Sequence, residues 1–168
     1  MKGRISGVGL AALVGLVAAV EHPALADERM LAYQAVVHIT ETHALPVPGR
    51  DGHEIGLAAF RGLAIFDDGR IANHWYSGSF DFVDGGGRFQ GYMLWAFEDG
   101  SELRATYRGR ADPAEGGGIA FEGTQSDVTG AGGYDGVTGE GSFAGRRVDH
   151  LGQGGDTWYR GTLTLTVR

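Results

Sequence analysis

The sequence predicts an all-β protein, an eight-stranded antiparallel up-and-down β-barrel that follows an N-terminal signal peptide. No long segment carries apolar residues at the 3.6-residue period of an amphipathic helix. Strand-length apolar runs recur instead, separated by turn residues. Residues 123–145 contain eight glycines, which disfavours a helix there and is typical of bent strands at barrel corners. An open two-sheet sandwich is the structural alternative.

The first 26 residues have the three parts of a secretory signal peptide. A basic start, MKGR, precedes an uncharged stretch at residues 5–20, and Ala24, Leu25 and Ala26 match an A-x-A cleavage site. The apolar stretch is too short for a membrane span. The sequence therefore predicts a signal peptide at 1–26, a single barrel domain at 27–168, a periplasmic or secreted location and no membrane anchor after cleavage.

Composition limits the chemistry. The chain has no cysteine, which excludes a lipid-modified cysteine, disulfides and thiol catalysis. Its formal net charge is −7 and it has no basic run, so we expect no nucleic-acid partner.

Eight strands are expected in the mature chain, and tight turns connect most of them. The Asp68-Gly69 turn, flanked by strand residues, is typical of a hairpin. Closure of the sheet would remove exposed edges and leave room for packed side chains or one small ligand. The expected strands are residues 30–44, 55–66, 71–83, 88–97, 102–110, 119–128, 136–147 and 157–167.

Alternating residues define a buried face and a solvent face in most strands, but the strand at 88–97 is apolar on both. Met93, Trp95 and Phe97 form one face, and Tyr92, Leu94 and Ala96 form the other. Because exposed apolar strips tend to mark interfaces, we expect the second face to contact another subunit.

The glycine-rich stretch VTGAGGYDGVTGEGSF, residues 128–143, resembles the signature of the allene oxide cyclase and dirigent-type barrels. Gly130, Gly132, Gly133, Tyr134, Gly136, Gly139 and Gly141 carry the resemblance, which extends over about residues 64–168. It implies an eight-stranded barrel, often trimeric, with an apolar cavity and no cofactor. Family members cyclise or isomerise small hydrophobic molecules, or guide their coupling. The signature contains none of the family's catalytic residues, so the resemblance transfers none.

Four other motifs lack the context that a nucleotide-binding, metal-binding or catalytic site requires. Residues 139–144 match G-x-G-x-x-A, but no helix follows to form a dinucleotide site. The GAGGYD stretch at 130–135 occurs once, whereas such calcium repeats work as stacks; Asp127 and Asp135 remain a calcium alternative. His38 and His43 are five residues apart and would share a face only across a bulge. We expect no metal site, and no framed nucleophilic serine occurs.

An aromatic set on neighbouring strands indicates a ligand cavity. Tyr76, Phe80, Trp95 and Tyr107 are the expected ligand-binding residues, and a plain packed core is the alternative. His38 and Glu41 are the candidates for a catalytic polar group at the cavity. The expected partner is a small hydrophobic molecule. The protein would be a cofactor-free isomerase or cyclase acting by shape, or a non-catalytic binding or structural barrel.

Overall fold

The computed structural model describes residues 27–148, 151 and 154–167, and it shows a closed antiparallel barrel of eight strands in sequence order. The predicted signal peptide at 1–26 lies outside the described residues. A single turn of 3₁₀ helix, η1 (Gly132–Tyr134), follows the sixth strand. The strands are β1 (Asp27–Pro46), β2 (His53–Phe66), β3 (Ile71–Val83), β4 (Gly86–Phe97), β5 (Glu102–Pro113), β6 (Ile119–Ala131), β7 (Val137–Arg147) and β8 (Thr157–Val167).

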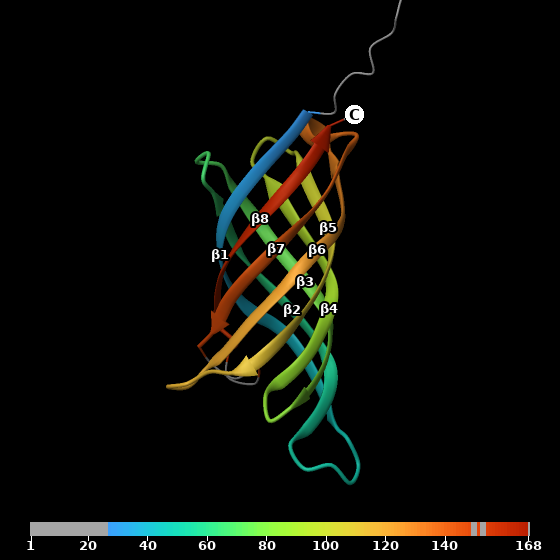
Figure 1. Cartoon of the computed structure of the whole chain (residues 1–168), viewed down its shortest axis with the longest axis vertical. Coiled ribbons are helices and arrows are strands. Elements are labelled where there is room, and N and C mark those ends of the chain that lie inside the picture. Colours follow the sequence, from blue (N-terminus) through green and yellow to red (C-terminus); the bar gives the residue numbers. More distant parts are fainter. Residues whose placement is uncertain (1–26, 149–150, 152–153, 168) are drawn as a thin grey trace, which may run out of the picture.

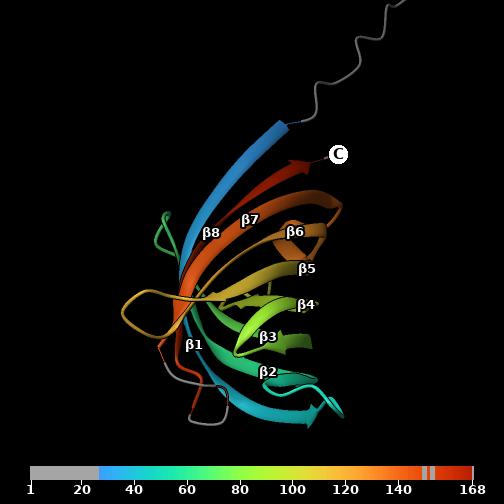
Figure 2. The same ribbon diagram turned by 60° about the horizontal axis from the view of Figure 1, so that its bottom comes forward.

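The up-and-down order gives the barrel two distinct ends (Figures 1 and 2). The start of β1, the end of β8, η1 and the β2–β3 and β4–β5 turns lie at one end, which we call the η1 end. The remaining connections lie at the other end, which we call the mouth. Pairing of β1 with β8 closes the sheet, so the barrel expectation is confirmed and the open sandwich is excluded. No helix among the described residues is long and apolar enough to cross a bilayer.

Two bulges shift the pattern of side chains along the strands. The register between β1 and β2 changes between Ile39 and Glu41, and that between β6 and β7 changes between Gln125 and Val128. Asp127, in the second bulge, has a φ of 52°. A bulge inserts one extra residue, so side chains beyond it change faces relative to strict alternation.

The expected faces of β4 are confirmed. Trp95 is fully buried and Met93 is 5% exposed, whereas Tyr92 on the opposite face is 72% exposed. The inward residues of β5, Leu103, Ala105 and Tyr107, are buried as well. Period-2 alternation therefore reports correctly which side chains fill the barrel.

Inside the barrel, bulky aromatic rings lie over glycines of adjacent strands. Phe143 pairs with Gly123 on one side and with Gly161 on the other. A Cβ atom at Gly123 would lie 2.4 Å from Phe143 Cζ, and one at Gly161 would lie 2.5 Å from the Tyr33 ring. The glycines therefore provide the space into which the rings pack, and this role goes beyond the corner predicted at residues 123–145.

A cation lies among aromatic rings at the η1 end. The Arg70 guanidinium lies 5.0 Å from the centroid of Phe97 and 5.4 Å from that of Tyr134, and it also bonds to the Tyr134 hydroxyl. Asp68 pairs with it at 2.6 Å. The hydrogen bond from Arg70 is the main cause that lowers the pKa of Asp68 below its usual value.

We predict that Gly161→Ala lowers the free energy of unfolding by about 3 kcal/mol, because the new methyl group would overlap the buried Tyr33 ring and the core cannot yield. Gly136→Ala is the matched control, since a Cβ there meets nothing within 4 Å and only its φ of 75° is unfavourable, at about 1 kcal/mol. Urea unfolding of both variants measures the difference. Equal losses would contradict the role given to close packing.

Candidate functional site: a cavity at the mouth of the barrel

The barrel contains a cavity of about 70 Å³ at its mouth, where β7 ends and β8 begins. Aromatic rings from each of the strands β2 to β8 form most of its wall, and the β7–β8 connection adds Leu151. This side of the lumen is therefore apolar, with a few polar groups among the rings. The lining aromatic residues are Phe60, Tyr76, Phe80, Phe82, Phe89, Tyr107, Phe121, Phe143 and Tyr159.

Arg147 is the charged group of this cavity. It is the last residue of β7, it points inward, and it is 9% exposed. Its guanidinium carbon lies 5.8 Å from the centroid of the Phe82 ring. Its Nε atom is buried and has no hydrogen-bond partner among the described residues. Burial lowers the pKa of Arg147 below its usual value.

Two phenols face the same space. Tyr76 stacks on Phe60 with a centroid distance of 4.5 Å, and Tyr107 lies edge-on to Tyr76 at 5.8 Å. Burial raises the pKa of both tyrosines well above the usual value. Both phenols are therefore neutral near pH 7 and can donate hydrogen bonds. Neither can serve as a general base at that pH, because the phenolate form is unfavourable.

Beneath the cavity lies a fully buried histidine. His74 stacks on Trp95 with a centroid distance of 5.0 Å. Its Nδ1 lies 2.8 Å from the Leu94 carbonyl oxygen, which fixes Nδ1 as the donor and leaves Nε2 to accept from the Tyr159 hydroxyl. Burial lowers the pKa of His74 to about 4, so the ring is neutral near pH 7. His74 is therefore a buried core residue whose two ring nitrogens both have hydrogen-bond partners.

The structure brings together three of the four expected ligand-binding residues. Tyr76, Phe80 and Tyr107 all line the cavity. Trp95 points into the barrel but lies deeper, against His74 and Tyr33. The alternation of β4 gives its direction correctly, and its depth follows from its position two residues from the end of β4 at the η1 end, away from the mouth.

His38 and Glu41 are exposed on the outer face of β1 and do not reach the lumen. Inward positions before the bulge are Leu31, Tyr33, Ala35 and Val37, so His38 falls on the other face. The bulge after Ile39 places Glu41 and His43 on that outer face too, where His43 Nε2 lies 2.9 Å from Glu41 Oε1. The expectation that His38 and Glu41 lie at the lumen is therefore wrong, because both side chains point to the outer face of β1.

Sequence reasoning missed Arg147 as a lumen residue. The alternation along β7 could have identified it. Val137 and Phe143 point inward, and the period-2 pattern that they define extends to Arg147. An arginine next to Arg146 near a strand end is, however, typical of a solvated surface. The structure separates the two, with Arg146 exposed outside and Arg147 buried inside.

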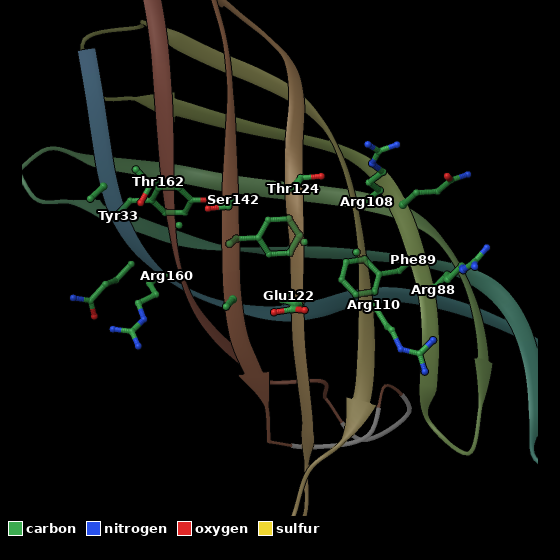
Figure 3. Close-up of a pocket in the computed structure, with 18 of the residues that line it drawn as sticks. Tyr33, Arg88, Phe89, Arg108, Arg110, Glu122, Thr124, Ser142, Arg160 and Thr162 are labelled. Atoms are coloured by element: carbon green, nitrogen blue, oxygen red, sulfur yellow. The ribbon is translucent and has the colours of Figure 1, made fainter. Parts of the chain in front are cut away.

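A second, wider hollow of about 1,160 Å³ lies on the outer face of β4–β8 and is open to solvent (Figure 3). Arg88, Arg108 and Arg110 project on one side of it and Arg160 on the other, with Glu122 between them. These side chains are exposed. An open polar surface cannot desolvate a small guest, so the smaller cavity at the mouth is the better candidate site.

The described residues hold no group of three or more histidine, aspartate or glutamate side chains that could bind a metal ion. Asp127, a member of the calcium alternative, accepts hydrogen bonds from Thr106 and Ser126.

Comparison with known proteins supports the fold. The structure of the pterocarpan synthase dirigent protein GePTS1 matches with a TM-score of 0.51 and 14% sequence identity, over 89% of this chain and 100% of that one. No family model and no curated protein matches the sequence. The chain thus has the dirigent-type barrel fold, and the resemblance inferred from the glycine-rich stretch is confirmed at the level of the fold.

The depressed pKa of His74 predicts a loss of stability in acid. The unfolded chain takes up a proton near pH 6.5, but the folded one does so only near 4, so acid favours unfolding across that range. We expect a loss of about 2 kcal/mol between about pH 7 and about pH 4.5, beyond the loss shown by His74→Asn, which keeps a donor for Leu94. Urea unfolding of both proteins at the two pH values measures this. Equal pH dependence would contradict the assignment.

Proposed function

We propose that this protein is an exported barrel that binds a small hydrophobic molecule at the mouth of its lumen. The observation that carries the proposal is the aromatic cavity beside the buried Arg147 Nε, which has no hydrogen-bond partner among the described residues. Buried polar atoms of folded proteins normally have partners, so an orphan atom facing a cavity supports a bound guest. The predicted signal peptide supports export to the periplasm or beyond.

The size of the cavity limits the guest. Ligand pockets usually measure about 300–1,000 Å³, and this one measures about 70 Å³. We infer that one end of a small molecule enters the lumen and the remainder lies at the mouth. The same volume favours a second candidate, a filled barrel with a structural role, for which we expect a cavity below about 100 Å³.

Any catalysis would work by conformation rather than by proton transfer. Tyr76 and Tyr107 are neutral near pH 7 and His74 lies behind the cavity wall, so none of the described residues that line the cavity is a poised general base. The name of the dirigent neighbour describes a synthase on this fold, which supports an isomerase or cyclase that holds a guest in a reactive shape. It supports no particular substrate.

Filling the cavity tests binding. Ala58 is buried on β2 and lines the cavity, while its neighbour Ala59 faces the outer side. We predict that Ala58→Phe weakens binding of benzyl alcohol, a neutral ring-sized probe, at least about tenfold, because the new ring occupies the space. Ligand-observed NMR titration measures this, with Ala59→Phe as the matched control.

The outcomes separate the two candidates. Loss of binding in Ala58→Phe alone supports the ligand-binding barrel. Absence of binding to the wild-type protein favours the filled barrel. Should Ala58→Phe fail to fold, Ala111→Leu replaces it, because Ala111 is 2% exposed and lines the same cavity.

We also propose that the barrel forms a homo-oligomer, with a trimer favoured by the family resemblance. The expected contact face on β4 carries Tyr92, which is 72% exposed, beside the partly buried Leu94 and Ala96. A further apolar group lies on the outer face where Trp158, Val36 and Leu63 are cross-strand neighbours. Apolar surface of this kind supports association.

Native mass spectrometry tests the assembly. We predict a trimer that Tyr92→Asp shifts to monomer, because a carboxylate at an apolar contact loses its hydration without a partner. Thr138→Asp, an exposed position on β7, should leave the trimer intact. A monomeric wild-type protein would contradict the oligomer proposal and leave the cavity proposal standing.

A further inference from the structure

We propose that the end of the guest that enters the lumen carries a carboxylate, which the guanidinium of Arg147 receives. This inference rests on the proposed function and specifies its ligand class, a small carboxylic acid with an apolar body. It follows from a comparison of the two ends of the barrel, each of which places one arginine among aromatic rings.

At the η1 end, the arginine has its counter-ion within the chain. Arg70 lies among Phe66, Phe97 and Tyr134, and Asp68 binds it through several hydrogen bonds, one of them 2.6 Å long. Arg70 is also more exposed, with 33% of its side chain accessible. The chain therefore supplies a carboxylate even to the better hydrated of the two arginines.

At the mouth, an arginine again lies against an aromatic ring, but no carboxylate among the described residues pairs with it. Arg147 lies over Phe82 and is 9% exposed, yet none of the ion pairs among the described residues includes it. Removing a charged group from water without a partner is unfavourable. A position for an anion is thus present in the lumen, where the cavity opens beside Arg147.

The donors around this position suit a planar carboxylate. A guanidinium presents a rigid fork of N–H groups that matches two carboxylate oxygens. The Tyr76 phenol lines the same cavity, whereas Thr157, the cross-strand partner of Arg147, donates its hydroxyl to the Gly155 carbonyl oxygen at 2.7 Å and leaves the anion to the guanidinium. The rings of Phe80, Phe82 and Tyr107 would then contact the apolar body of the acid.

A pair of isosteric probes tests the charge preference. Benzoate and benzamide have the same shape, and only benzoate is anionic near pH 7. We expect the wild-type protein to bind benzoate about tenfold more tightly or better, since hydrogen bonds between charged groups exceed those of neutral pairs by about 1 kcal/mol or more. Isothermal titration calorimetry, or ligand-observed NMR for weak binding, gives both dissociation constants.

Adjacent arginines provide matched variants. Arg147→Gln should remove the preference for benzoate and change benzamide affinity less than about threefold, whereas Arg146→Gln, outside the barrel, should leave the preference unchanged. Arg147→Lys keeps the charge without the fork and should keep part of the preference. This variant serves in place of Arg147→Gln if the latter does not fold.

Each outcome decides the proposal. Equal affinity of the wild-type protein for both probes overturns the carboxylate inference and leaves lumen binding intact. Binding of neither probe overturns this inference together with the proposed function. A benzoate preference that survives Arg147→Gln, or that disappears in Arg146→Gln, places the anion outside the lumen and overturns the proposal.

Discussion

The barrel depends on the fit between large aromatic rings and glycines of the neighbouring strands. An eight-stranded barrel has an interior just wide enough for side chains, so a ring can enter only where the adjacent strand leaves room. Phe143 lies between Gly123 and Gly161, and Gly161 in turn receives the Tyr33 ring. Much of the glycine content is therefore a packing requirement, and the rings it admits form the wall of the cavity.

The two ends of this lumen differ in how the charge of an arginine is compensated. At the η1 end, the half-buried Arg70 forms an ion pair with Asp68. Arg147 lies at the mouth beside a cavity and without such a carboxylate among the described residues. The two ends therefore differ in charge compensation, although both place an arginine against aromatic rings.

The chemistry of the lumen favours binding and orientation over acid–base catalysis. Burial keeps Tyr76 and Tyr107 in their neutral forms and also keeps His74 neutral. These groups can donate or accept hydrogen bonds without changing charge near pH 7. The arginines of the outer hollow, in contrast, are exposed to solvent.

The sequence by itself determined the all-β class, the eight strands and most inward faces, because a period of two and strong turn residues are local properties. It also indicated Tyr76, Phe80 and Tyr107, which alternation places inside. Only the tertiary structure decided three placements. Glu41 points outward, Trp95 lies deeper in the lumen than the cavity, and Arg147 points into the lumen. Bulges reset alternation, and closure joins residues far apart in the chain: Gln125 bonds to Tyr33, 92 residues away, and His74 to Tyr159, 85 residues away. No local pattern encodes such contacts, because they exist only once β8 pairs with β1.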